Sequence, residues 1–226
     1  MKDTVELVFI LDRSGSMAGL EQDTIGGFNS LIEKQKNKKG SSAIVSLVLF
    51  NHTSEVIYNR VPLNEIRSLT LSDFVVGGST ALLDTIGGSI NRVKRTHDLL
   101  GENDSPNKVI YVITTDGQEN ASRYFSKRKI KDMVLRNEEE GWEFIFLGSN
   151  IDSFQAAHNY GFRYERVSNY RNNREGVRDL YSSLDRVISD VRSNREIRDN
   201  WNENLKEDKD NTKKSKLSTT DKINIS

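Results

Sequence analysis

The chain has 226 residues, and its 33 Lys plus Arg residues balance its 33 Asp plus Glu residues. This balance gives no reason to expect nucleic acid or an anionic membrane as a partner. The sequence contains no cysteine, which excludes disulfides, thiolate metal sites and a cysteine nucleophile. Charged residues near the N-terminus argue against a signal peptide, and no apolar stretch has the length of a membrane span. These features favour a soluble cytoplasmic protein.

A cluster of polar residues follows the first apolar run of the chain. Residues 5–11 are apolar with one exception, which is typical of a strand buried on both faces. Asp12, Ser14 and Ser16 then place a carboxylate and two hydroxyls at alternate positions. Apolar residues at helical spacing predict a helix over residues 20–36. The polar residues are therefore expected in a strand-to-helix loop, where open α/β sheets bind their ligands.

This predicted helix is followed by a hairpin. Within the helix, Gly26 and Gly27 predict close packing on the sheet. Residues 43–50 and 55–61 are predicted strands, and the short turn between them requires antiparallel pairing. The segment 63–76 is predicted to be irregular or a short helix, anchored by its large apolar residues: Leu69, Leu71, Phe74 and Val75.

Two more polar loops are predicted further along the chain. The motif Gly-Gly-Ser-Thr80 precedes a helix that runs to about residue 100, and Thr80 is the expected N-cap. Residues 108–114 form a predicted buried strand that ends in Thr-Asp116-Gly. This second carboxylate therefore also lies at the carboxyl end of a strand.

The rest of the chain continues the alternation of strands and helices. We expect a helix from the cap Ser126 to Gly141, a strand at 142–147, a short helix capped by Asp152, an edge strand at 162–167 and a long helix over 177–191. This order predicts a three-layer, doubly wound α/β domain, with helices on both faces of a mostly parallel sheet. We place the domain at residues 1–200 and expect the polar residues 201–226 to form a disordered tail.

Three predicted loops offer oxygen ligands for a metal, because a doubly wound sheet can bring such loops to one edge: Asp12, Ser14 and Ser16 in the first, Ser79 and Thr80 in the second, and Asp116 in the third. This set of carboxylates and hydroxyls suits Mg²⁺, Mn²⁺ or Ca²⁺ and is poor for Zn²⁺ or Cu. With so few anionic ligands the cation keeps positive charge and bound water, which Mg²⁺ tolerates best. An incoming carboxylate would complete such a site.

These motifs resemble the metal-ion-dependent adhesion site (MIDAS) of von Willebrand factor A (vWA) domains. Asp12-x-Ser14-x-Ser16, Gly-Gly-Ser-Thr80 and Thr-Asp116-Gly match it in order and context, and the resemblance covers about residues 3–192. It implies a six-stranded sheet with one antiparallel edge strand, a metal held by these residues, and a protein partner whose Glu or Asp binds that metal. The compact chain without cysteine is similar to short stand-alone members from bacteria and their phages.

The first hypothesis is therefore a metal-dependent protein-interaction module that is not an enzyme. A second hypothesis is a Mg²⁺-dependent hydrolase or phosphotransferase with Asp12 as nucleophile. Such enzymes of the haloacid-dehalogenase type carry a second Asp two residues on, where this chain has Ser14. The sequence also lacks a phosphate-binding P-loop and a nucleophile elbow. A serine nucleophile would need a base, and no histidine lies near Ser14 or Ser16 in the sequence.

A third hypothesis is RNA or ribonucleoprotein binding through the Arg- and Tyr-containing stretch 163–178. A solvated surface is favoured instead, because Glu165 and Glu175 dilute its charge. Glu119 is likewise expected to be a solvated loop residue, and Asp84 a partner of its helix dipole. No two histidines have the spacing of a metal site, so we expect them to be structural or exposed.

Overall fold

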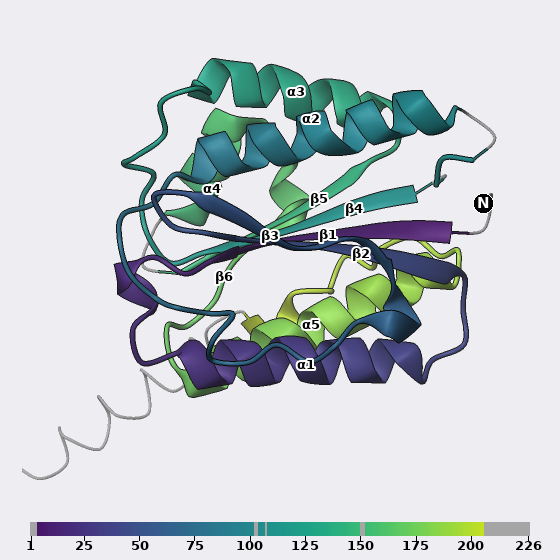
Figure 1. Ribbon diagram of the computed structural model, residues 1–226, viewed down its shortest axis with the longest axis horizontal. Coiled ribbons are helices and arrows are strands. Elements are labelled where there is room, and N and C mark those ends of the chain that lie inside the picture. The colour runs from purple at the N-terminus through teal and green to yellow at the C-terminus, as the bar shows by residue number, and fades with distance from the viewer. Residues whose placement is uncertain (1–3, 102–103, 107, 150–151, 206–226) are drawn as a thin grey trace, which may run out of the picture.

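The computed structural model describes residues 4–101, 104–106, 108–149 and 152–205. Six strands form one sheet in the order β3-β2-β1-β4-β5-β6, and helices cover both of its faces (Figure 1). The strands are β1 (Thr4–Asp12), β2 (Ser42–Phe50), β3 (Ser54–Pro62), β4 (Lys108–Thr115), β5 (Glu143–Gly148) and β6 (Val167–Asn169). The helices are α1 (Glu21–Lys36), α2 (Leu82–Leu100), α3 (Lys127–Glu139), α4 (Ser153–Tyr160) and α5 (Arg174–Arg192).

The pairing of the strands confirms the predicted mostly parallel sheet. β1 lies between β2 and β4 and is parallel to both, with Leu11 opposite Leu49 on one side and Thr114 on the other. β3 is antiparallel to β2, as the short turn requires. The carboxyl ends of β1 and β4 therefore meet at one edge of the sheet, and both predicted carboxylate loops leave from that edge.

Side chains of β1 alternate between two cores, because successive residues of a strand point to opposite faces. Leu7 and Phe9 pack in the core under α1 and α5, whereas Val8 and Ile10 pack in the core under α2, α3 and α4. No helix among the described residues is long and apolar enough to cross a membrane.

The charged residue inside β1 is Glu6, which is completely buried. Its carboxylate accepts a hydrogen bond from Arg60 of β3 and lies 2.8 Å from Nε2 of His97 of α2. A buried carboxylate is costly without such partners. His97 is therefore a structural residue, as expected from its isolated position in the sequence.

The predicted edge strand at 162–167 is wrong in its position. Residues Tyr164–Arg166 form a turn of 3₁₀ helix, and the strand β6 follows at Val167–Asn169. Phe162 is held differently: its N–H donates to the carbonyl of Ala157 at the end of α4, and its ring stacks on Phe146 with centroids 5.1 Å apart. Packing of this ring in the core, and not strand pairing, therefore sets its backbone.

The described chain also departs from the expected domain end at residue 200. Trp201 and Leu205 are buried in the core under α5. The indole N–H of Trp201 donates to the carbonyl of Glu165 at 2.8 Å. The folded domain therefore extends at least to residue 205, and the rest of the predicted tail, residues 206–226, lies outside the described residues.

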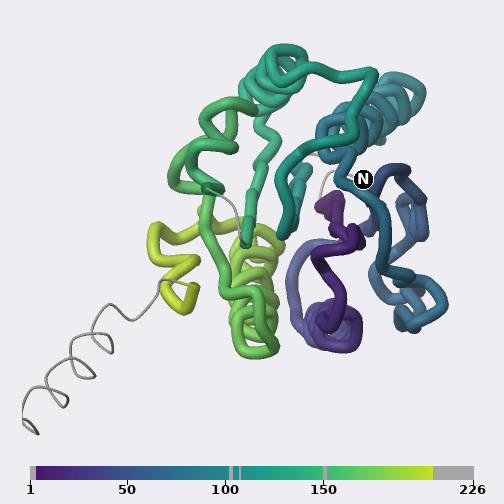
Figure 2. Tube along the Cα trace, turned by 90° about the vertical axis from the view of Figure 1, so that its left-hand side faces the viewer, coloured from purple at the N-terminus to yellow at the C-terminus, as the bar shows by residue number. Residues whose placement is uncertain are grey.

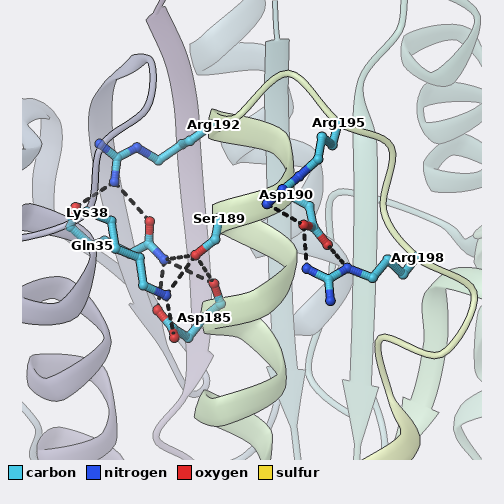
Figure 3. Close-up of polar contacts among 8 residues, drawn as sticks. All are labelled: Gln35, Lys38, Asp185, Ser189, Asp190, Arg192, Arg195 and Arg198. Atoms are coloured by element: carbon cyan, nitrogen blue, oxygen red, sulfur yellow. Dashed lines mark hydrogen bonds and ion pairs between the residues drawn. The ribbon is translucent and has the colours of Figure 1, made fainter.

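The side-by-side helices α1 and α5 are joined by a polar network at their C-terminal ends (Figure 3). The side-chain amide of Gln35 donates to Ser189 Oγ at 2.9 Å and to Asp185 Oδ1 at 2.8 Å. Its carbonyl oxygen accepts from Arg192 at 2.9 Å. Both ends of the Gln35 amide are thus used to hold α5 against α1.

The glycine pair in α1 serves a different contact from the predicted one with the sheet. A Cβ on Gly27 would lie 2.1 Å from the ring of Tyr181 in α5, so Gly27 makes room for that ring. A Cβ on Gly26 would meet nothing within 4 Å. Only Gly27 is required by packing, and its partner is a helix.

Gly27→Ala should therefore lower the free energy of unfolding by about 1–3 kcal/mol, because the buried Tyr181 ring must move. Gly26→Ala is the matched control and should raise it by up to about 1 kcal/mol through helix propensity. Urea unfolding of both variants measures the difference. Equal stability of the two variants would contradict this account of Gly27.

Candidate metal centre

The first predicted ligand, Asp12, is the last residue of β1 and is 1 % exposed. Its Oδ1 accepts the backbone N–H of Ser14 at 2.7 Å, and its Oδ2 accepts the hydroxyl of Thr115 at 2.7 Å. Burial raises the pKa of Asp12, and the hydrogen bonds from Ser14 and Thr115 partly oppose this. The carboxylate is thus oriented by the loop after β1 and by the last residue of β4.

Ser14 and Ser16 connect this loop to the loop after β4. Their hydroxyl oxygens are 3.1 Å apart and share a hydrogen bond. The Ser16 hydroxyl also donates to Asp116 Oδ1 at 2.6 Å. Ser14 is buried and Ser16 is exposed, so the cluster opens to solvent on the side of Ser16.

Thr80 reaches the cluster because the preceding glycines run along the first loop. Gly77 donates its N–H to the carbonyl of Arg13, and Gly15 donates to the carbonyl of Gly78, both at 3.0 Å. Gly78 has a φ of +78°, and a Cβ there would lie 2.2 Å from Nδ1 of His52. Figure 2 looks onto this edge of the sheet, where the two loops lie side by side.

The three hydroxyls converge on one point beside Gly117. A Cβ added to Gly117 would lie 3.1 Å from Thr80 Oγ1, 3.3 Å from Ser16 Oγ and 3.8 Å from Ser14 Oγ. A side chain on Gly117 would therefore enter the space between the hydroxyls. The absence of a Cβ keeps this space open in front of the polar groups.

Asp116 supplies an unsatisfied charge to the same cluster. It is 2 % exposed, and its Oδ2 is buried without a hydrogen-bond partner. Burial raises the pKa of Asp116 to about 6, against the lowering effect of the Ser16 hydrogen bond and with a further rise from Asp12 nearby. A cation would supply what this oxygen lacks, since a buried charge needs a partner.

The residues present fit a hard divalent cation. The five predicted positions come together as two carboxylates and three hydroxyls: Asp12, Ser14, Ser16, Thr80 and Asp116. Among the described residues no group of three or more His, Asp or Glu side chains could hold a metal, so a site here depends on its hydroxyls. Oxygen ligands of this kind suit Mg²⁺, Mn²⁺ or Ca²⁺.

Helix capping does not explain these residues. Leu20 is the N-cap of α1, and no side chain caps that end. The predicted N-cap role of Thr80 is also wrong, because Ala81 is the N-cap of α2. The backbone N–H of Thr80 instead donates to the side chain of Asn120 at 2.9 Å. Its hydroxyl is thus left free to face the cluster.

The role expected for Glu119 as a solvated residue is corrected by the structure. Its carboxylate accepts the N–H of Leu83, in the first turn of α2, at 2.9 Å. It also accepts the N–H groups of Ala121 and Ser122 and the hydroxyl of Ser122, at 2.7–2.9 Å. Glu119 therefore caps α2 from the loop after β4 and holds the Thr80 and Asp116 loops together.

Asp84 completes this fastening from the side of α2. Its carboxylate accepts the backbone N–H groups of Arg123, Tyr124 and Phe125 at 2.7–2.9 Å. Thr115, Asn120 and these loop contacts were missed in the sequence, because their partners lie 36–103 residues away. The one local signal was the position of Thr115 directly beside Asp116.

The structure gives little support to a serine nucleophile. The hydroxyls of Ser14 and Ser16 bond to each other, and the Ser16 hydroxyl also donates to Asp116. His52 lies against the Gly78 position, but no hydrogen bond joins it to either serine within the described residues. The arrangement is better suited to holding a cation than to deprotonating a serine.

The positive charges of the stretch 163–178 are neutralised by acidic side chains of the same chain. Each of its five arginines forms an ion pair with an acidic residue. Arg163 pairs with Glu138, Glu143 and Glu165, Arg166 with Glu143, Arg171 and Arg178 each with Glu175 and Asp179, and Arg174 with Asp23. Phosphate binding would have to compete with these carboxylates. The hypothesis of an RNA-binding surface is weakened accordingly.

No family model matches the chain, and no curated protein matches it. Solved structures do. Proximal thread matrix protein 1 from the mussel byssus, with zinc in its MIDAS motif, is 14 % identical over 82 % of this chain, with a TM-score of 0.54. The ArnB paralog VWA2 from Sulfolobus acidocaldarius is 16 % identical over 82 % of this chain (TM-score 0.52). The manganese-loaded TRAP protein of Plasmodium vivax is 17 % identical over 76 % (TM-score 0.51).

The chain spans less than half of the length of the first two, at 46 % and 45 %, and 70 % of the third. At such identities the similarity concerns the fold alone. It confirms the fold expected from the sequence motifs: the chain has the fold of a von Willebrand factor A domain.

Proposed function

We propose that this protein is a metal-dependent protein-interaction module, not an enzyme, which holds Mg²⁺ at the cluster and binds a carboxylate of its partner through that metal. The observation that carries the proposal is the convergence of three hydroxyls next to Asp116, whose buried Oδ2 has no partner. These groups are held by three loops that hydrogen bonds join to one another, so little ordering is needed when a cation binds.

Each residue has a defined part in this proposal. Ser14, Ser16 and Thr80 offer neutral oxygens, and Asp12 and Asp116 offer the negative charge. This donor set neutralises a divalent cation less than a set of three or four carboxylates would. A bound Mg²⁺ supplies positive charge that attracts an acidic side chain, and the exposed Ser16 marks the side from which such a group approaches.

The comparisons support the metal and the partner class only in general terms. Structures of proximal thread matrix protein 1 with zinc in its MIDAS motif and of manganese-loaded TRAP share this fold, and so does a minor pilin. Mg²⁺, the acidic side chain and a cytoplasmic location remain our proposals; a chain without cysteine suits a reducing compartment. Metal-dependent phosphatase turnover that Asp12→Asn abolishes would favour the enzyme instead.

Calorimetric titration of metal-stripped protein with Mg²⁺, Mn²⁺ and Ca²⁺ tests the proposed site. We expect binding to one site in the wild type. Asp12→Ala or Asp116→Ala should lower the metal affinity by more than about 100-fold. Loss of a residue that only hydrogen-bonds to a metal ligand typically lowers affinity by roughly 10–100-fold, and these residues contribute the charge of the site itself. Asp132→Ala, which changes an exposed carboxylate on α3, is the matched control and should bind normally. Equal binding by all the variants would contradict the site.

Binding should also depend on pH, because a proton competes with the cation at Asp116. With a pKa of about 6 for Asp116, Mg²⁺ affinity should be about tenfold weaker at pH 5 than at pH 7. Calorimetry at both values measures this. An affinity that stays constant between them would contradict the assignment of Asp116.

In the metal-free protein the same group should make stability fall as pH rises. The pKa of Asp116 in the folded chain, about 6, exceeds its ordinary value of 3.8. Its contribution to stability is therefore fully present below 3.8 and is lost as pH rises through about 6. Urea unfolding in chelator at pH 5 and pH 7 should show this difference, and Asp116→Asn should remove it.

A further inference from the structure

Two large aliphatic side chains are exposed on the segment that leads into the Thr80 loop. Leu71 is 55 % exposed and Val75 is 63 % exposed, although the sequence predicted both as anchors. The anchors are instead Leu69 and Phe74, which are 3 % and 1 % exposed. Leu69 and Phe74 thus hold this irregular segment to the domain, while Leu71 and Val75 present apolar surface to solvent.

The segment contains no strand or helix, but side-chain hydrogen bonds fix its backbone. Asn29 of α1 donates to the carbonyl of Leu69 at 3.0 Å and accepts its N–H at 2.8 Å. The carboxylate of Asp73 accepts the N–H of Thr70 at 2.8 Å and forms two hydrogen bonds with Arg67, at 2.6 and 2.8 Å. The exposed side chains therefore sit on a preordered backbone, which reduces the entropy lost when a partner binds.

Leu71 and Val75 help to line a groove of about 640 Å³. Its lining also includes Ala18 and Gly19, which follow Ser16 closely in the chain, and Asp23 of α1. We call this hollow the aliphatic groove. Its aliphatic wall continues into Gly77, whose N–H bonds to the carbonyl of Arg13 between the predicted ligands. The groove lining thus adjoins, at Ala18 and Val76, the two loops that carry Ser16 and Thr80.

We propose that the aliphatic groove is a second contact for the partner that binds the metal. The partner is a protein segment that gives Glu or Asp to the cation and, within three residues of it, an apolar side chain to Leu71 and Val75. This inference rests on the proposed function and specifies the partner further. A segment with an acidic residue alone should bind weakly, and a segment with an aliphatic residue beside the acidic one should bind tightly.

The charges of the groove make a second acidic residue unfavourable on this side. Glu21 and Asp23 lie along it, and the one cation among its lining residues, Arg174, already pairs with Asp23 at 3.0 Å. A carboxylate placed there would meet like charges with no free arginine. An apolar neighbour of the ligating acid would instead cover Leu71 and Val75.

The probe is a set of fluorescent, end-blocked nonapeptides with a central Glu, in which the flanking positions carry Leu, Ser or Asp. Fluorescence anisotropy is measured with Mg²⁺ and with chelator. The proteins are the wild type, the double variant Leu71→Ser with Val75→Ser, and Asp12→Ala. Leu135→Ser on α3, where Leu135 is 42 % exposed, is the matched control for loss of a surface leucine. Calorimetry checks Mg²⁺ binding by each protein.

In Mg²⁺ we expect Leu-flanked peptides to bind the wild type at least about tenfold more tightly than Ser-flanked ones. Burial of one aliphatic side chain favours binding by about this factor. Asp-flanked peptides should bind most weakly. The double variant should lose the preference for Leu while its Mg²⁺ affinity is unchanged, and Leu135→Ser should keep both.

Four outcomes would overturn the inference, and they separate it from the proposed function. Mg²⁺-dependent binding with the same affinity for Leu and Ser flanks, or a preference for Leu that survives in the double variant, removes the aliphatic groove and leaves the metal module standing. Self-association that the double variant abolishes would assign the groove to a second copy of the chain. Failure of every peptide to bind in a Mg²⁺-dependent way would overturn the proposed function and this inference together.

Discussion

Parallel pairing of β1 between β2 and β4 is the constraint on which the candidate site depends. In a parallel sheet the carboxyl ends of neighbouring strands share an edge, and here that edge receives the loops after β1 and after β4. Asp12 and Asp116, which are 104 residues apart in the sequence, thereby lie in one cluster. Ser16 of the first loop donates to Asp116, and Thr115 at the end of β4 donates to Asp12. Had β4 paired elsewhere, each loop would be an ordinary turn.

The cluster brings charge into a place where it is costly. Asp12 and Asp116 are both almost fully buried, and burial raises the pKa of each carboxyl. Neutral hydroxyl and backbone N–H donors surround the two carboxylates. Within the described residues no Lys or Arg forms an ion pair with either aspartate. Such a site is electrostatically incomplete without a cation, and this incompleteness is what makes metal-dependent recognition reasonable.

Side-chain hydrogen bonds fasten loops and helix ends at both ends of the sheet, beside the cluster and at the starts of β2 and β4. Glu119 and Asp84 fasten the loop after β4 to α2 through backbone N–H groups. On the opposite face, α5 is held against α1 through Gln35, and the buried Asp190 pairs with both Arg195 and Arg198 after the helix (Figure 3). The chain thus uses carboxylates as acceptors that order irregular segments, and Asp73 does the same for the segment that carries Leu71.

The sequence by itself determined the alternation of strands and helices and the residues of the candidate site, because apolar periodicity and polar residues at strand ends are local signals. It did not determine the partner of Gly27, the place of β6, the capping role of Glu119 or the exposure of Leu71. These depend on which groups become neighbours: Tyr181 faces Gly27 from another helix, and Glu119 meets α2 across 36 residues. Only the tertiary structure decides such contacts, since packing selects one of several arrangements that local sequence allows equally.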